Sequence, residues 1–116
     1  MTAIKIPAHI QPYIETLGEE LGVKFLLSFG GSYVHISERP QERSPVVALI
    51  GHDKTVALAK RLMTGSFRVP TAKPFIAQVF RGKGWTVNMI ARELHVTDVS
   101  VRGWLKPDLG RQLQLL

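Results

Sequence analysis

Apolar residues recur at helical spacing in several segments of the 116-residue chain, and glycines and prolines separate these segments. Between Tyr13 and Phe29 the apolar positions follow a helical period. Glycine weakens a helix, so a turn between two shorter helices is expected near Gly22. The pair Gly30-Gly31 ends this helical region. Residues 32–37 alternate apolar and polar side chains and are rich in β-branched and aromatic types, which predicts a short strand.

A second helical region follows residues 38–43, a charged loop that we expect to be flexible. Ser44-Pro45 predicts a helix start, because serine caps helix N-termini and proline suits the first helical position. After the break at Gly51, Asp53 is expected to cap the next helix. The predicted elements are a helix over 46–50, a helix over 54–63 with Val56, Ala59, Leu62 and Met63 facing the core, and a strand over 66–69.

The two regions share the order helix, glycine and strand at a spacing of about 34 residues, which suggests an internal repeat, with chance similarity as the competing explanation. A single short strand buries little surface, and two strands form only a marginal sheet. Partner strands from a second subunit would complete such a sheet, so the pattern favours a homodimer. The strand residues assigned to this contact include Ile36, Phe67 and Val69.

The last third of the chain contains three helical segments that share an apolar face. Thr86 and Thr97 are expected to cap the second and third helices, over 87–95 and 98–106. His95 falls at a turn position where the backbone tends to be left-handed, a conformation that histidine tolerates better than most residues. Ala91 is small where the two helices would cross. The predicted core consists of Phe75, Phe80, Ile90, Leu94, Val101 and Trp104, with Val96 filling the turn.

This spacing is typical of a helix-turn-helix unit, whose second helix enters the major groove of double-stranded DNA. Arg102 is the candidate for a base contact, because a guanidinium can bond both acceptors of guanine. Val99 can touch a thymine methyl, whereas cations and helix N-termini suit phosphates. Asp98 opposes phosphate contact and is explained by its place in the first turn of a helix. The candidate DNA-binding residues are Arg81, Lys83, Thr86, Thr97, Asp98, Val99, Ser100, Arg102, Gly103 and Lys106.

The charge distribution supports an anionic partner for the same part of the chain. The formal net charge is +6, and residues 71–116 carry seven lysines and arginines against three acidic residues. The absence of cysteine excludes disulfides and thiolate zinc sites and fits a reducing compartment. With no signal peptide and no long apolar run, the sequence predicts a cytoplasmic protein without a membrane segment.

Candidate enzymatic groups are sparse. The four histidines have no metal-ligand spacing, so no metal site and no cofactor are expected. The adjacent pair His52-Asp53 is better explained as a helix start than as an acid–base site. The chain is therefore interpreted as a non-enzyme. The alternative is a protein-interaction or assembly module without sequence-specific DNA binding, and a third possibility is a small enzyme or its regulatory subunit.

The layout resembles the Mor transcription activator family of Mu-like bacteriophages. The resemblance depends on a helix, a Gly-Gly turn and a short strand between Phe25 and Ile36, together with the helix-turn-helix over 75–106. It implies a dimeric phage or prophage regulator that binds promoter DNA and activates transcription by contacting host RNA polymerase. It also implies that the dimer core includes Gly30, Gly31, Tyr33 and Val34.

Taken together, the sequence predicts a mainly α-helical fold in two parts. Residues 1–70 form an N-terminal helical dimerisation region with short β-strands, and residues 71–116 form a three-helix helix-turn-helix domain. The expected function is sequence-specific binding of double-stranded DNA in transcription regulation, as a homodimer.

Overall fold

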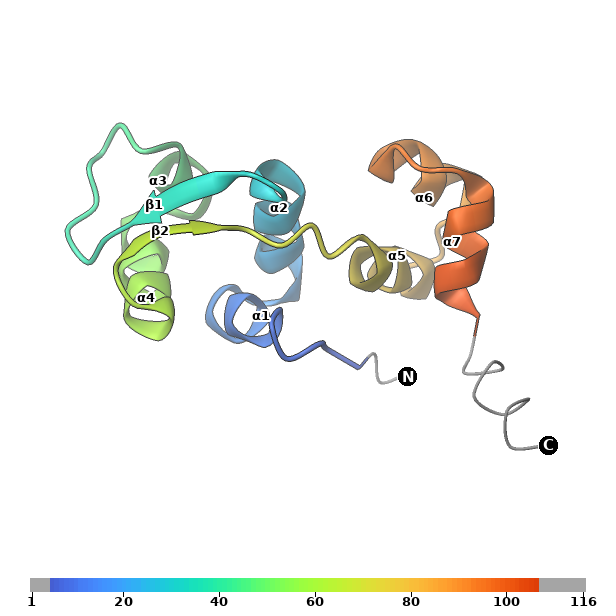
Figure 1. Cartoon of the computed structure of the whole chain (residues 1–116), viewed down its shortest axis with the longest axis horizontal. Helices are drawn as coiled ribbons and strands as arrows, with labels where there is room; N and C mark the ends of the chain where they lie inside the picture. The colour runs from blue at the N-terminus through green and yellow to red at the C-terminus, as the bar shows by residue number, and fades with distance from the viewer. Residues whose placement is uncertain (1–4, 107–116) are drawn as a thin grey trace. The chain divides into compact units, whose positions relative to one another are not determined.

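The computed structural model of the protein describes residues 5–106, and most of these residues lie in seven helices and one two-stranded antiparallel sheet (Figure 1). The mainly helical class with a small β element is therefore confirmed. Two compact units are present, one formed by residues 6–72 and one formed mainly by residues from Lys73 onward. The apolar tail from Gly110 to Leu116 lies outside the described residues.

The first unit contains the same order of elements twice, a short helix, a longer helix and a strand. A glycine joins the two helices in each half, Gly18 at φ 84°, ψ 165° and Gly51 at φ 87°, ψ 164°. Both glycines donate a 2.8 Å hydrogen bond to the carbonyl four residues earlier. The repeat suggested by the sequence is thus present in the backbone. Its elements are α1 (Gln11–Leu17), α2 (Glu19–Phe29), β1 (Tyr33–Ile36), α3 (Pro45–Ile50), α4 (His52–Leu62) and β2 (Gly65–Arg68).

The break between the first two helices lies at Gly18, so the predicted turn near Gly22 is wrong. Gly18 has a positive φ that glycine adopts at little cost, whereas Gly22 is buried within α2. A Cβ atom at Gly22 would lie 2.7 Å from Cδ1 of Ile14 on α1. Glycine at position 22 weakens the helix propensity of the segment, but because it has no Cβ atom it lets α1 and α2 pack closely.

The start and the core face of α4 also differ from the prediction. Gly51 is the N-cap, and Asp53 lies in the first turn without a side-chain capping hydrogen bond. Thr55 enters the core because its hydroxyl donates to the carbonyl of Gly51 at 2.7 Å. Met63 follows the helix at φ 74° and is 78% exposed. The buried side chains of α4 are Thr55, Leu58 and Ala59, while Val56 and Leu62 are half-buried.

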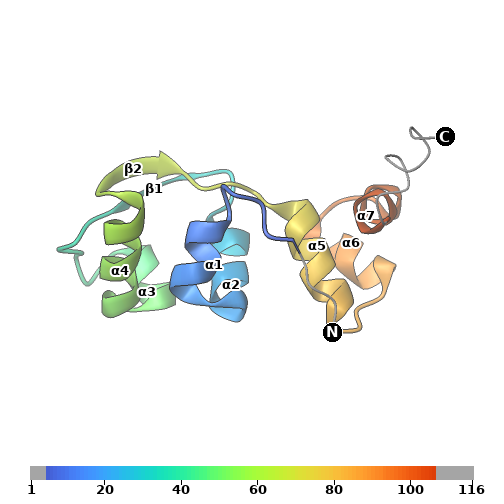
Figure 2. The ribbon, with the colours of Figure 1, turned by 90° about the horizontal axis from the view of Figure 1, so that it is seen from below.

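The two predicted strands pair with each other in an antiparallel register. Tyr33 faces Arg68, and His35 faces Ser66. Successive side chains of a strand point to opposite faces, so Val34 and Ile36 enter the core while their neighbours remain exposed. Figure 2 shows the sheet along one side of the helices of this unit. The outer sheet face, defined here as Tyr33, His35, Ser66 and Arg68, is exposed.

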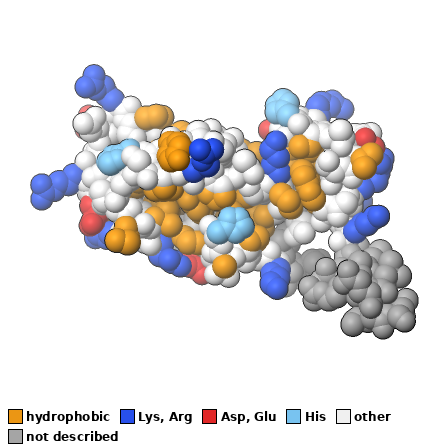
Figure 3. Space-filling model, viewed as in Figure 1, with side chains coloured by type: hydrophobic (Ala, Val, Ile, Leu, Met, Phe, Trp, Pro, Cys, Tyr) orange, Lys and Arg blue, Asp and Glu red, His pale blue; other side chains and the backbone are white. Residues whose placement is uncertain are grey.

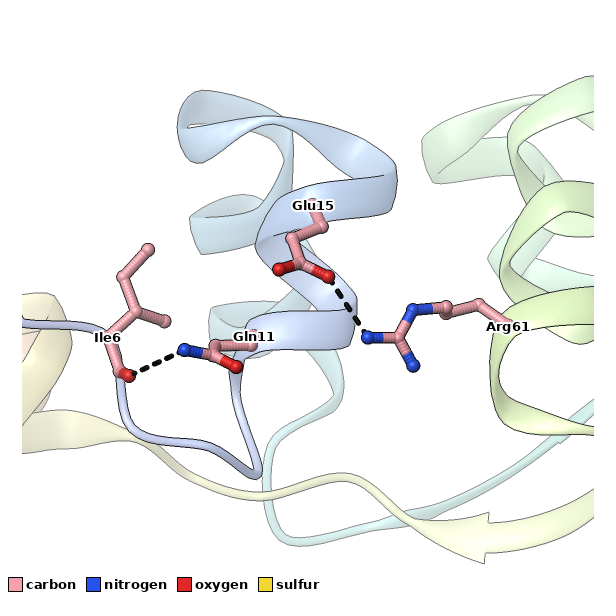
Figure 4. A network of polar contacts seen from close by, with 4 residues as sticks. All are labelled: Ile6, Gln11, Glu15 and Arg61. Carbon is pink, nitrogen blue, oxygen red and sulfur yellow. Dashed lines mark hydrogen bonds and ion pairs between the residues drawn. The ribbon is translucent and has the colours of Figure 1, made fainter.

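An ion pair joins the first helix of the first half to the second helix of the second half. Arg61 of α4 donates to Oε1 of Glu15 on α1 at 3.0 Å, and Gln11 approaches the carbonyl of Ile6 at 3.5 Å (Figure 4). Both charged side chains are about half exposed. Such a pair contributes at most about 1 kcal/mol, so the unit depends mainly on its apolar core.

The second unit consists of three helices around a small apolar core. Five of the six predicted core residues are buried, and the sixth, Trp104, is only half-buried near the end of its helix. Trp85 is also half-buried and stacks on Phe80, with ring centroids 4.1 Å apart. No helix among residues 5–106 is long and apolar enough to cross a membrane. The helices of this unit are α5 (Lys73–Gly82), α6 (Val87–Leu94) and α7 (Asp98–Leu105).

Candidate nucleic-acid interface

A tight turn joins α6 to α7. His95 ends α6 in the left-handed conformation, at φ 56° and ψ 47°, as the sequence predicts. The next backbone N–H, of Val96, donates to the carbonyl of Ala91 at 3.0 Å and closes the turn. The side chain of Val96 is half-buried. This turn fixes where α7 begins.

Threonine hydroxyls cap both helices, which confirms two predictions from the sequence. The Thr86 hydroxyl accepts from the backbone N–H of Met89, and the Thr97 hydroxyl accepts from that of Ser100, each at 3.1 Å. The hydroxyls of Thr97 and Ser100 are also 3.1 Å apart. Both threonine hydroxyls therefore already hold the ends of helices, and a DNA contact would share them with the fold.

Buried side chains set which side of α7 faces outward. Ile90, Ala91 and Leu94 of α6 are buried, as is Val101 of α7. Gln78 of α5 adds a 3.4 Å hydrogen bond to the carbonyl of Trp104. With Val101 directed inward, the side of α7 away from the core is exposed, and Asp98 and Ser100 at its edge are half-buried. The α7 outer face is defined here as Val99, Arg102, Gly103 and Lys106.

Two residues of the α7 outer face do not serve the stability of the fold. Val99 is 70% exposed, so its side chain gains little from burial. Gly103 lies within the helix, and a Cβ atom there would have no other atom within 4 Å. Glycine inside a helix costs about 1 kcal/mol relative to alanine. Neither side-chain crowding nor a positive φ explains this glycine, but a backbone that another molecule approaches closely would.

The guanidinium of Arg102 is oriented by a neighbour on the same helix. Asp98 lies one turn earlier, and its Oδ2 is 2.6 Å from a guanidinium nitrogen of Arg102. A guanidinium has five N–H donors, so this contact leaves most of them available. The pair also removes part of the negative charge that Asp98 would otherwise present to a phosphate backbone.

The end of α5 and the loop that follows it hold two of the predicted phosphate contacts. Nη1 of Arg81 donates to the carbonyl of Trp85 at 2.9 Å, so this arginine also braces the loop. Lys83 is exposed beside Gly84, which has a φ of 92°. Residues 73–106 carry six lysines and arginines against two acidic residues. In Figure 3, lysine and arginine side chains are scattered around the edge of the visible face of this unit, and few acidic side chains are seen there.

The sequence interpretation missed two features of this surface. Arg92 is exposed in the last turn of α6, and its charge alone was available as a signal. The pairing of Asp98 with Arg102 was also missed, although the spacing of four residues is the one at which opposite charges meet on a helix.

The predicted dimerisation residues lie in the other unit, and most of them build its interior. Val34, Ile36 and Val69 are buried, and Phe67 is half-buried. Gly31 is exposed and donates to the carbonyl of Val69 at 2.7 Å. Tyr33 alone in this group offers a large exposed side chain, at 67% exposure. A Cβ atom at Gly30 would lie 2.5 Å from the carbonyl oxygen of Leu26, so this glycine serves close packing.

The histidines are spread over the surface of the described chain. Nδ1 of His35 lies 3.2 Å from the Ser66 hydroxyl across the sheet. His52 is 3.6 Å from Asp53, and both side chains are well exposed. Within residues 5–106 no group of three or more histidine, aspartate or glutamate side chains is placed to hold a metal ion.

The geometry of α6 and α7 is the basis for any assignment of function to this chain. The resemblance to the Mor family remains a prediction from the sequence motifs. Comparison of the chain with known protein families, with curated proteins and with solved structures finds no match.

Proposed function

We propose that the protein binds double-stranded DNA in a sequence-specific manner and regulates transcription. The observation that carries the proposal is the α7 outer face, on which Val99, Arg102 and Gly103 are exposed. Val101, on the opposite side of α7, is buried in the core and holds the helix in place. The spacing of Val99, Arg102 and Gly103 places them on one side of the helix. An exposed helix side with a branched apolar group, a guanidinium and a glycine suits insertion into the major groove.

Each residue of this face has a chemical role in the proposal. Arg102 donates to the two acceptors of a guanine edge while Asp98 holds its guanidinium in place. Val99 packs against a thymine methyl, and Gly103 lets the helix backbone approach the groove. Lys83, Lys106 and the first N–H groups of α6 after Thr86 contact phosphates and set the register.

We further propose that the first unit forms a homodimer. Its two-stranded sheet has an exposed outer face, on which the Arg68 guanidinium stacks 4.8 Å from the ring centre of Tyr33. A sheet of two strands is marginal alone, and a second copy on this face would bury the Tyr33 ring. Sedimentation equilibrium tests this step: Tyr33→Glu is expected to give monomers, whereas Met63→Glu, at another exposed apolar residue, keeps the dimer. Equal behaviour of the two variants contradicts this surface.

Activation of transcription through host RNA polymerase, and a phage or prophage origin, extend the proposal by resemblance to the Mor family alone. A regulator of this kind binds two half-sites related by two-fold symmetry when it is a dimer.

Duplex binding with matched charge reversals tests the DNA assignment. Arg102→Glu and Lys60→Glu change the net charge equally, but Lys60 is an exposed residue of α4 in the first unit. Fluorescence anisotropy with a labelled duplex pool is expected to show a loss of more than about tenfold for Arg102→Glu and a small loss for Lys60→Glu. Equal losses would mean that net charge, and not the α7 outer face, drives binding.

A protein-interaction module is the second candidate, and exposed apolar side chains favour it. Met89 of α6 is 46% exposed, and Val99 of α7 is 70% exposed. These exposed apolar side chains would suit an apolar protein partner. Such a module would show no salt-sensitive affinity for duplex DNA. The same anisotropy titration therefore separates the two functions.

A further inference from the structure

A cavity of about 540 Å³ lies within the first unit, and none of the residues assigned above to DNA contact lines it. It is partly open to solvent and lies between the end of α2, β1 and the segment that connects β1 to α3. Its volume is in the range of pockets that hold small molecules. The sequence interpretation described this segment only as a flexible charged loop.

Local hydrogen bonds hold the connecting segment in shape. The Arg39 backbone N–H donates to the Ser37 hydroxyl, and the Ser44 N–H donates to the carbonyl of Gln41, both at 3.0 Å. The Ser44 hydroxyl then accepts from the N–H of Val46 and begins α3. The wall of the cavity is therefore defined by turns at both ends of the segment, with Pro40 restricting the backbone between them.

The charges that line the cavity are of one sign. Arg39 and Arg43 both line it, whereas their acidic neighbours in sequence, Glu38 and Glu42, do not. The segment carries equal numbers of arginines and glutamates over residues 38–43, so its composition hides this asymmetry. Two guanidinium groups without a carboxylate among the lining residues favour an anion, and their paired N–H donors match carboxylate and phosphate oxygens.

Part of the cavity lining is apolar. Its lining residues include Val34 and Val46, which are buried, and Phe29, which is half-buried. A bare inorganic ion would leave this apolar lining in contact with water, whereas a ligand with an apolar body would cover it.

We propose that this cavity binds a small organic anion, with its carboxylate or phosphate held by Arg39 and Arg43 and its planar apolar body packed against Phe29, Val34 and Val46. The site lies within one unit and stands independently of the proposed DNA binding. The charged group and the apolar body of the ligand make separate contacts with the cavity. The contribution of each to the binding affinity can therefore be tested by itself.

Titration of the full chain with 1-naphthyl phosphate, followed by two-dimensional amide NMR, tests the site. The expected result is saturable shift changes concentrated in residues 29–46. 1-Naphthol lacks the charge and inorganic phosphate lacks the body, so each should bind at least about tenfold more weakly. A parallel titration with 1-naphthoate determines whether a carboxylate serves as well as a phosphate.

Arginine variants provide the matched comparison. Arg39→Gln combined with Arg43→Gln should weaken 1-naphthyl phosphate at least about tenfold, while Lys60→Gln, an exposed cation outside the cavity, leaves its affinity unchanged. The single variants guard against a folding defect, and each should give an intermediate loss. Shifts outside residues 29–46, no saturation, equal binding of 1-naphthol, or equal losses in the arginine and lysine variants would overturn the proposal.

Discussion

The carboxylate of Asp98 lies 2.6 Å from the guanidinium of Arg102 on the exposed side of α7. The two residues occupy successive turns of one helix, so the contact needs no other part of the chain. It restricts the rotamers of a long side chain before any partner arrives. An arginine held in this way loses less conformational freedom when it binds, which favours selective contact over non-specific attraction.

Replacement of Arg102 by alanine should weaken binding to the preferred DNA sequence by about 1–3 kcal/mol and relax the base preference at one position. The reason is the loss of the paired donors to guanine. Competition between preferred and random duplexes measures the effect. A loss of the same size on every sequence would contradict a base-reading role for Arg102.

Gly103→Ala should stabilise the protein and weaken its DNA binding. Alanine raises helix stability by about 0.5–1 kcal/mol at an exposed position with open space, as here. The added methyl group would also stand between α7 and the groove. Chemical denaturation and anisotropy measure the two effects, with Ser28→Ala, an exposed site on α2, as the control. Unchanged DNA affinity in Gly103→Ala would remove the close-approach role of this glycine.

Lys83→Ala should weaken binding to all duplexes alike and reduce the slope of affinity against salt concentration by about one unit. The exposed lysine is proposed to contact a phosphate, and each such contact releases counterions. Titrations at several salt concentrations give the slope. If the slope stays the same as in the unaltered protein, Lys83 makes no phosphate contact.

The first unit should lose stability at high pH through Tyr13. Burial raises the pKa of Tyr13 from 10.0 to about 12, so the folded state holds the phenol proton more tightly than the unfolded state does. This contribution is complete below pH 10 and is lost as the pH rises from 10 to 12. Tyr13→Phe should therefore lose less stability over that interval, and Tyr33→Phe, at an exposed ring, serves as the control. Identical pH profiles would show that burial of Tyr13 has no such effect.

Met63→Gly should raise the free energy of unfolding by about 1 kcal/mol. Met63 adopts φ 74° and ψ 144° and is 78% exposed, so it bears backbone strain without contributing much burial. Glycine relieves that strain, and this gain exceeds its larger loss of chain entropy. Thermal unfolding with Met63→Ala as the control checks the result. Equal stability of the glycine and alanine variants would show that strain at residue 63 is negligible.

The sequence predicted the structure best where short-range interactions alone determine the backbone conformation. The caps at Thr86 and Thr97 and the left-handed turn at His95 follow from short-range hydrogen bonding and sterics, and all three were predicted. The repeated order of helix, glycine and strand and the break at Gly51 were also predicted, whereas the matching junction at Gly18 was not.

The errors arose where tertiary packing decided the outcome. Gly22 was interpreted as a helix break, yet contact with Ile14 makes it a packing residue within α2. Thr55 was not predicted in the core, because its polarity hides the hydrogen bond that satisfies its hydroxyl. The separation of the arginines from the glutamates at the cavity depends on the path of the backbone over 37–46, which periodicity does not report.

Selection from a random duplex library is the most direct test of whether α7 reads DNA sequence. The purified full chain would be incubated with the library at two salt concentrations, and the retained DNA would be sequenced. If α7 reads sequence, one two-fold-symmetric motif is enriched at both salt concentrations. Recovery of no motif, with binding that disappears at moderate salt, would contradict sequence reading and leave only charge-driven contact.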